Sequence, residues 1–328
     1  DPAKRSLVRC WGQRGTLHIY APEDWALILA ARLKWSPGGR TKFMPDAAVV
    51  ADAEERVAAL GRLVTRTDLL DIAPDAYVDE VEPHIRKWAK QMVKGEHTDE
   101  NIRATAVRFA ASRLVWAMSH RGTLCHANKV GNEQGYALRT QWFGDLDFEI
   151  GDADDAAMTL IRRYIASCGP VTDRDVAHFC GAKITATRRW LKALKPETTA
   201  IACEEKPGLF ALTADIDALT EPAPTDDELW PISVLPMWDG YLMMHADKRW
   251  TTATEADEKQ VWRKSAVVKS VVLQRGRAVA IWEHKMMAKR VDVTLTPLSS
   301  WTPELRAAVK KPIKAFGKHL GLVTGRLK

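Results

Sequence analysis

The sequence predicts an α+β fold, mostly α, in which tandem winged helix-turn-helix modules precede a small antiparallel β domain. The first observation behind this prediction is an internal repeat, because LVRCWGQRGTL at residues 7–17 recurs without a gap as LVWAMSHRGTL at residues 114–124. The second is the order helix, short helix, turn, helix and hairpin over residues 156–213. The third is a set of alternating apolar and polar runs after residue 266, which is typical of a sheet.

These observations divide the chain into four expected domains. They are residues 1–43, a remnant of a first winged helix with its wing hairpin and one helix; 44–150, a second winged helix with connecting helices; 151–220, a third winged helix-turn-helix; and 221–328, a carboxyl-terminal β domain with a closing helix.

In each copy of the repeat an apolar run meets a polar turn that ends in Gly, and a second apolar run follows, which predicts a β-hairpin. The first strands of these hairpins are expected at residues 7–11 and 114–118. The first copy has six residues before its hairpin and the chain has no initiator Met, so we expect an amino-terminal segment to be missing.

A helix should open at Pro22 and break at residues 35–39. Its expected buried face consists of Trp25, Ile28, Leu29 and Leu33.

The second module is predicted to contain helices at 45–64 and 79–94, joined by a helical turn at 67–70. A further helix starts at Thr98 and leads into a hairpin with strands at 122–126 and 136–142.

In the third module, Gly181 is expected to make the turn before the last helix. The predicted helices are 156–166, 173–179 and 185–194, and the wing strands are 199–204 and 209–213. A Pro- and acid-rich linker at 221–228 then leads to predicted strands at 267–274, 278–284 and 290–296 and a closing helix at 303–317.

The composition indicates where the protein is located and whether it binds a metal. The longest apolar stretches are far shorter than a membrane span and no secretory signal is visible, so we expect a cytoplasmic monomer with no membrane partner. The five cysteines form no CxxC pair and have no His at ligand spacing. We therefore expect buried thiols, no metal and no cofactor.

Charge is segregated along the chain. Residues 46–100 carry 13 acidic and 7 basic side chains, residues 158–195 carry 2 and 8, and residues 304–328 carry 1 and 7. This pattern favours a polyanion as partner, and double-stranded DNA fits it. The alternative is that these residues are solvated helix faces.

The last helix of the third module is the presumed recognition helix. It mixes long cations with short hydroxyl donors, which suits phosphate contact and groove reading. The candidate DNA contacts are Lys183, Thr185, Thr187, Arg188, Arg189 and Lys192. Alternatively, Trp190, Leu191 and Leu194 form a buried face and the cations cover the other side, in a module that binds protein.

Four residues elsewhere are candidates for a site. Arg14 and Arg121 occupy matching wing positions, where a cation meets a phosphate or, alternatively, fixes the hairpin against a carboxylate. His18 is specific to the first copy, and a lone His is more often structural than catalytic. Asp239 could face an active site, or it could cap a turn while Tyr241 packs, and we prefer the structural interpretation.

Three segments resemble one family. LVRCWGQRGTLH at 7–18 resembles the LVRtWxxRGTLH element of the bacterial winged-helix proteins typified by AlkZ, the azinomycin-resistance DNA glycosylase. VLPMWDGYL at 234–242 resembles the family's LLPxFDxYL, with Trp238 in place of Phe. VLQRGRAVAIW at 272–282 resembles its vlvDGrvvGtW hairpin and departs from it at Arg275 and Ala280.

The resemblance implies three winged helices and a small β domain that form a concave basic surface for duplex DNA. It implies excision of alkylated or crosslinked bases without metal or cofactor, by a Gln-x-Gln or Gln-x-Asp motif that positions the attacking water. That motif lies upstream of RGTLH, and Gln13 is the only Gln near the element in this chain. The catalytic residues are therefore unknown, with His18 and Asp239 as second-tier candidates.

Three hypotheses follow. The first is a DNA-repair glycosylase whose DNA contacts include Arg14, Arg121, Arg188, Arg189 and Lys192. The second is a non-catalytic DNA-binding or transcription-regulatory protein. The third is a protein-interaction scaffold, which predicts no salt-dependent affinity for DNA.

Overall fold

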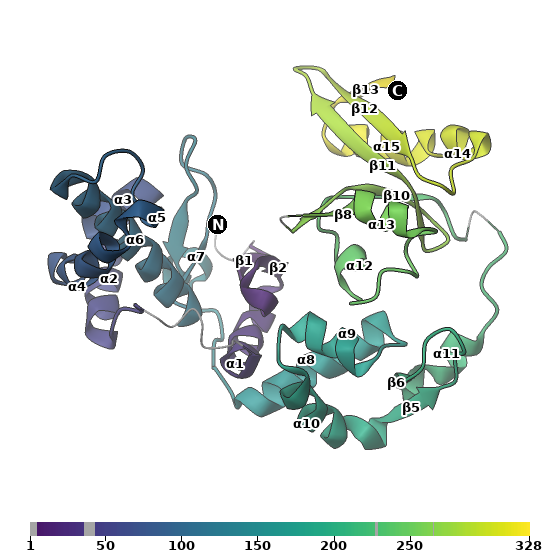
Figure 1. Ribbon diagram of the computed structural model, residues 1–328, viewed down its shortest axis with the longest axis horizontal. Helices are drawn as coiled ribbons and strands as arrows, with labels where there is room; N and C mark the ends of the chain where they lie inside the picture. Colours follow the sequence, from purple (N-terminus) through teal and green to yellow (C-terminus); the bar gives the residue numbers. More distant parts are fainter. Residues whose placement is uncertain (1–4, 36–42, 227–228, 265) are drawn as a thin grey trace. The chain divides into compact units, whose positions relative to one another are not determined.

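The computed structural model describes residues 5–35, 43–226, 229–264 and 266–328. The chain forms two compact units, one made of residues up to 161 together with 180–190, and the other of 162–179 together with 191–328. Helices and small, mainly antiparallel sheets alternate along the chain (Figure 1). The predicted mixed α and β composition is therefore confirmed. Among the described helices, none is long and apolar enough to cross a membrane.

The first unit contains a four-stranded antiparallel sheet in the order β2-β1-β3-β4. Its strands are β1 (Val8–Trp11), β2 (Leu17–Tyr20), β3 (Leu124–His126) and β4 (Tyr136–Leu138). Arg9 of β1 pairs with His126 of β3, so the two copies of the sequence repeat contribute to one sheet. The predicted first hairpin is confirmed, and a short 3-10 turn, η2 (Gln13–Gly15), connects its strands.

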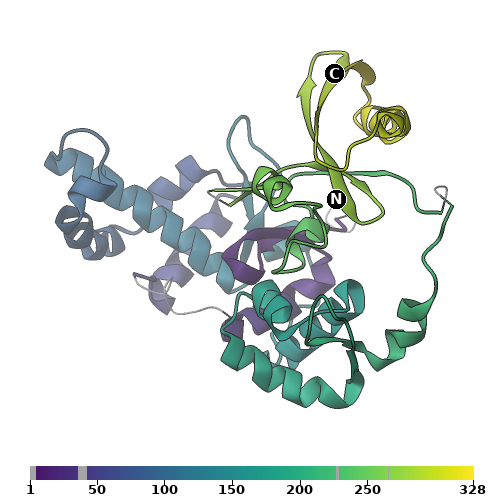
Figure 2. The same cartoon turned by 45° about the vertical axis from the view of Figure 1, so that its right-hand side comes forward.

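The second copy of the repeat does not fold as the first does. Residues 114–118 belong to the long helix α6 (Asp99–His120), which Thr98 caps, and the expected strand there is wrong (Figure 2). The reason is that Leu114 and Met118, four residues apart, continue the apolar face of this helix and are fully buried. The second predicted strand, 136–142, ends early because α7 (Arg139–Phe143) begins directly after Leu138.

The other helices of the first unit lie near the predicted ones, but the predicted helix 45–64 ends at Ala59, and the predicted helix 79–94 begins at Asp75 and is divided at Trp88. They are α1 (Trp25–Trp35), α2 (Ala47–Ala59), α3 (Arg66–Ile72), α4 (Asp75–Lys87) and α5 (Ala89–Met92). Trp25, Ile28 and Leu29 are buried as predicted, but Leu33 is 69 % exposed because the buried face of α1 continues through Arg32 and Trp35. The expected break at 35–39 falls largely outside the described residues.

The segment after residue 151 contains the predicted order of three helices and a hairpin. They are α8 (Ala153–Cys168), α9 (Asp173–Cys180), α10 (Ile184–Leu194), β5 (Thr198–Ile201) and β6 (Leu209–Leu212). Thr172 and Asp175 cap α9 reciprocally, with Thr172 N donating to Asp175 Oδ2 at 2.9 Å and Asp175 N donating to Thr172 Oγ1 at 3.2 Å. The short helix α11 (Ile216–Thr220) follows, and residues 222–226 form no helix or strand.

The second unit also contains a five-stranded sheet in the order β13-β12-β11-β10-β7. Its strands are β7 (Ser233–Leu235), β10 (Val271–Gln274), β11 (Arg277–Met286), β12 (Arg290–Pro297) and β13 (Val323–Leu327). Only the last pair, β12 with β13, is parallel. The predicted 267–274 strand is divided, because its first residues form β9 (Val267–Val268), which pairs with β8 (Trp262–Arg263).

Helices complete this part of the chain. The expected closing helix is two helices, α14 (Pro303–Ala308) and α15 (Lys310–His319), and α15 lies along the sheet (Figures 1 and 2). Ile313 and Phe316 of α15 pack against the sheet core, which contains Trp282. Two shorter helices, α12 (Gly240–Met243) and α13 (Glu255–Val261), precede β8.

Candidate nucleic-acid interface

The turn of the first hairpin gathers four polar side chains, Gln13, Thr16, His18 and Tyr20, which we call the hairpin cluster. The Tyr20 hydroxyl donates a short hydrogen bond to Gln13 Oε1, and Gln13 is buried. His18 Nε2 lies 2.8 Å from Thr16 Oγ1, and its ring stacks on Tyr20 with the ring centroids 5.6 Å apart. The turn is tight, because a Cβ at Gly12 would overlap the outer end of the Tyr20 side chain and would displace it.

The hairpin cluster is uncharged at neutral pH. Burial, reinforced by the positive charge of Arg14, lowers the pKa of His18 to about 4. Burial likewise raises the pKa of the Tyr20 phenol above its ordinary value. A neutral imidazole can accept a hydrogen bond or a proton, so His18 has the protonation state that a general base or a water-orienting group needs.

A buried cation that the sequence analysis missed supports this turn. Arg32, on the apolar face of α1, donates from Nη1 to the carbonyl oxygen of Trp11 at 2.6 Å. Its other terminal nitrogen contacts His120 Nε2 at the end of α6, and His120 Nδ1 lies 2.7 Å from the carbonyl oxygen of Trp116. The available signal was a cation on the apolar face of the run WALILAARLKW, which Ile28 and Trp35 share with Arg32.

Arg14 lies against the turn that precedes α10. It adopts a left-handed backbone with φ of 58°, and a Cβ built on Gly181 would lie 3.0 Å from the Arg14 Cα atom. Lys183 follows Gly181 by two residues and is exposed. The structure therefore brings together two of the predicted DNA contacts, Arg14 and Lys183, which are 169 positions apart in the sequence.

Along α10 the predicted contacts differ in their surroundings. Arg188 and Lys192 are exposed and one helical turn apart. Arg189 is also exposed, but it forms an ion pair with Asp154 at 2.8 Å, which also accepts from the Trp190 indole. Thr187 is fully buried and its hydroxyl donates to the Lys183 carbonyl oxygen, so this side chain supports the helix and offers no donor to DNA.

The two remaining candidates lie in other settings. Arg121 is the exposed C-terminal cap of α6, and not a wing residue equivalent to Arg14, because the second copy of the repeat begins inside the helix. Asp239 caps α12, with Oδ1 accepting from Tyr241 N at 2.9 Å, while the Tyr241 hydroxyl donates to the Gly276 carbonyl oxygen at 2.8 Å. These contacts agree with the preferred structural interpretation.

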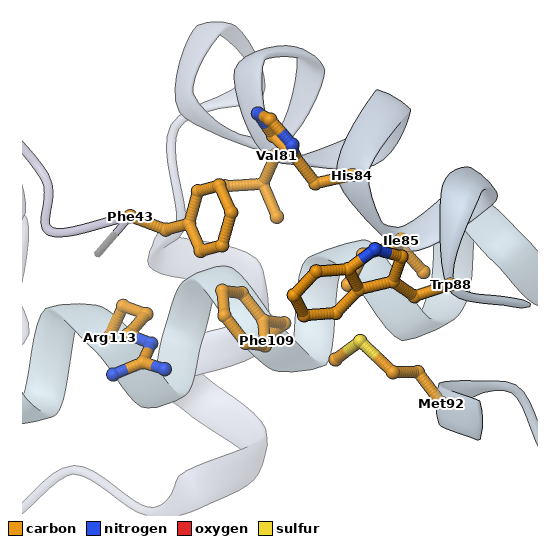
Figure 3. Close-up of a pocket in the computed structure, with 8 residues that line it drawn as sticks. All are labelled: Phe43, Val81, His84, Ile85, Trp88, Met92, Phe109 and Arg113. Atoms are coloured by element: carbon orange, nitrogen blue, oxygen red, sulfur yellow. The ribbon is translucent and has the colours of Figure 1, made fainter. Parts of the chain in front are cut away.

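Each unit also contains a cavity away from these residues. One, of about 230 Å³ in the first unit, is surrounded by the rings of Phe43, Trp88 and Phe109, with Arg113 beside Phe109 (Figure 3). None of the predicted site residues lines it. The other, of about 600 Å³, lies in the second unit. Within the described ranges, no cluster of three or more His, Cys, Asp or Glu could hold a metal ion, and all five cysteines are free thiols, three buried and two half-buried.

Comparison with known proteins places the chain in a family. The model of the family "DNA glycosylase AlkZ-like" matches residues 2–319. An interstrand DNA cross-link repair glycosylase from Streptomyces sahachiroi is 25 % identical over 335 residues, which cover 99 % of this chain and 81 % of the relative. The solved structure of the DNA glycosylase AlkZ from the same organism has a similar fold, with a TM-score of 0.66 and 22 % identity over 98 % of this chain and 81 % of that one. The chain therefore belongs to the AlkZ-like DNA glycosylase family.

Proposed function

We propose that this protein is a DNA-repair glycosylase that binds duplex DNA and hydrolyses the N-glycosidic bond of an alkylated or crosslinked base. The observation that carries the proposal is the family match over residues 2–319. The relative named for interstrand cross-link repair supports the choice of substrate.

The DNA-binding part of the proposal rests on the segment α8 to β6, which we interpret as a winged helix-turn-helix with α10 as its recognition helix. Arg188 and Lys192 are exposed on α10 and Lys183 is exposed directly before it, and Arg14 adds a cation beside the turn that leads into this helix. Phosphate contacts of this kind position a duplex without reading its sequence. We place the duplex along α10 and the hairpin turn.

In the proposed reaction a water molecule adds its oxygen to the sugar carbon and releases a proton to solvent. The bond from that carbon to the base nitrogen breaks, and the alkylated base, cationic while attached, leaves as a neutral molecule with the bonding electrons. Groups that orient the water and stabilise positive charge on the sugar accelerate this step. The hairpin cluster is our candidate for the wall of that site, with the neutral His18 as a positioning residue next to the buried amide of Gln13.

A base-release assay tests the proposal. The full-length protein is incubated with duplex DNA that contains a 7-methylguanine, and separately with a crosslinked duplex, and abasic sites are revealed by alkaline cleavage. We expect release from both substrates and loss of release in Arg14→Ala with retained folding. Binding to both duplexes without any release would overturn the glycosylase assignment and leave a non-catalytic DNA-binding protein.

A further inference from the structure

The cavity of the second unit combines three chemical groups that suit one ligand. Its volume of about 600 Å³ is lined by Cys203 and Glu205 from the β5–β6 connection, Arg249 and Trp250 from the segment before α13, and Arg277 from the start of β11. This size falls within the range of small-molecule sites. None of these residues belongs to the interface described above, so the cavity has no role in it.

The Trp250 indole is held as a platform. The Lys206 ammonium lies 5.1 Å from its ring centroid and is itself fixed by Asp175, 3.2 Å away. Asp175 and Lys206 are both buried, so this cation cannot leave without exposing an unpaired charge. Trp250 nevertheless remains 38 % exposed. A fixed, partly exposed indole is the kind of surface on which a nucleobase stacks.

A guanidinium stands beside this platform. Ala278 N donates to the Thr251 carbonyl oxygen at 2.7 Å, which holds the neighbouring Arg277 next to Trp250. Arg277 is exposed, and within the described part of the chain no carboxylate lies within ion-pair distance of it. Arg249 differs, because Asp247 accepts from its Nε at 3.0 Å and from its Nη2 at 2.7 Å. Arg277 is therefore the lining cation that is available for an external anion.

The third group is the Glu205 carboxylate. It lines the same cavity, and within the described residues it forms no ion pair, although its charge lies near Arg249. A carboxylate accepts hydrogen bonds from the exocyclic amino group of a base and repels phosphate. An aromatic face, a carboxylate for an amino edge and a guanidinium for a phosphate together match a nucleotide.

We propose that this cavity binds a nucleotide whose base stacks on Trp250, whose exocyclic amino group donates to Glu205 and whose phosphate is held by Arg277. The favoured source is an unpaired nucleotide of a DNA strand, and in this respect the inference rests on the proposed function. A free nucleotide carries the same chemistry, so the experiment separates the two sources.

The probe is 2-aminopurine, a fluorescent base with an exocyclic amino group, whose emission falls when it stacks. Three forms are titrated with the protein: a duplex with one unpaired 2-aminopurine, the fully paired duplex, and free 2-aminopurine deoxynucleoside monophosphate. We expect the duplex with the unpaired base to bind roughly 10-fold more tightly than the paired one, with quenched emission, because one stacked base contributes that order of affinity.

Four variants test the assignment of roles, with circular dichroism as the check on folding. Trp250→Leu should abolish both the quenching and the preference for the unpaired base, whereas Trp250→Phe should keep most of each. Arg277→Ala should weaken binding roughly 10-fold without removing the quenching, since it takes away a phosphate contact. Arg306→Ala, an exposed cation of α14 outside the cavity, should change neither.

The failure of this inference differs from the failure of the proposed function. Equal affinity for both duplexes, unchanged in Trp250→Leu, would overturn the nucleotide site and leave duplex binding intact. Quenching of the free nucleotide alone, lost in Trp250→Leu, would overturn the DNA source. If neither duplex binds while the free nucleotide is quenched, the proposed function is overturned, but the assignment of the cavity as a nucleotide site stands.

Discussion

The ionisation of His18 makes the stability of the folded protein depend on pH. Its pKa of about 4 in the folded protein is below the ordinary value of 6.5, so protons bind more tightly to the unfolded chain. The contribution of His18 to stability is therefore complete above about pH 6.5 and is lost as the pH falls toward 4. His126, buried beside Arg9, has the same lowered pKa and adds to the same decline.

We expect the urea midpoint to fall between pH 7 and pH 5, and to fall less in His18→Gln, whose amide has no proton to gain. Urea unfolding of both proteins at pH 7, 6 and 5 measures this. His126→Gln is the matched comparison and should flatten the decline to a similar extent. An identical decline in all three proteins would contradict the assignment of the low pKa to these buried rings.

A second residue-scale prediction concerns the buried pair of Lys206 and Asp175. Burial alone would raise the pKa of Asp175, but the imidazole of His245, 3.7 Å away, and hydrogen bonds from Thr172 and Ala246 together hold it well below its ordinary value, so the group stays ionised. In Lys206→Met this charge loses its cation, and we expect a loss of about 3 kcal/mol in the free energy of unfolding. Urea unfolding measures it, with the exposed Lys195→Met expected within about 0.5 kcal/mol of the original protein. Equal losses in the two variants would show that the pair contributes nothing specific.

Some site residues could be predicted one at a time and others could not. The exposure of Arg188 and Lys192 follows from the polar face of α10, which the spacing of its apolar residues defines. Thr187 lies three residues before Trp190, so it shares that buried face, and the spacing alone excludes it as a DNA contact. The contact between Arg32 and His120 could not be foreseen, because the two residues are 88 positions apart.

At the scale of elements, the sequence repeat shows how context overrides a local pattern. The letters LV begin a strand at residues 7–8 and lie within a helix at residues 114–115. The second copy follows a helix already capped at Thr98, and each added residue extends that helix for one more hydrogen bond. The three helices and hairpin after residue 151 were predictable because their caps, turn and spacings agree with one another.

The turn before α10 gives an element-scale prediction. Gly181 has a φ of 67°, and an added Cβ would lie 3.0 Å from the Arg14 Cα atom. Gly144 has a φ of 64° with nothing within 4 Å of an added Cβ. Gly144→Ala should thus cost about 1 kcal/mol for its backbone alone. Gly181→Ala should cost roughly 1 kcal/mol more, because it also crowds the hairpin turn.

Urea unfolding of the two variants measures the difference. A second readout is DNA affinity, which should fall in Gly181→Ala because Arg14 is displaced from the start of α10, and should stay unchanged in Gly144→Ala. Equal stability losses with equal DNA affinity would mean that the hairpin turn and α10 do not support each other.

At the scale of the whole molecule, the family was predictable because three separate motifs occur in the family's order, and the match over residues 2–319 confirms it. The two edge strands of the five-stranded sheet could not be predicted from the sequence. Neither β7, with three residues, nor β13, which contains a Gly, has a periodic pattern of its own, and both are strands because they pair with β10 and β12. The division into four domains stays a prediction.

The interface as a whole is tested by how its DNA affinity depends on salt. Each phosphate contact contributes about 0.9 to the slope of log affinity against log salt concentration, since binding releases counterions. Lys192 is exposed on α10 and Lys183 is exposed directly before it, so Lys183→Ala and Lys192→Ala should each reduce the slope by about 1. Arg189→Ala should reduce it by less, because Asp154 already neutralises that guanidinium at 2.8 Å.

The control for this series is Lys259→Ala, because Lys259 is an exposed cation already paired with Glu255 at 2.6 Å. Fluorescence anisotropy with one labelled duplex at 50 to 200 mM salt, a range over which phosphate contacts change affinity by orders of magnitude, gives all the slopes. The double variant of Lys183 and Lys192 should lose the sum of the two single effects, since distant phosphate contacts act independently. Slopes that fall equally in every variant, the control included, would mean that net charge attracts the duplex and that α10 is not its specific contact.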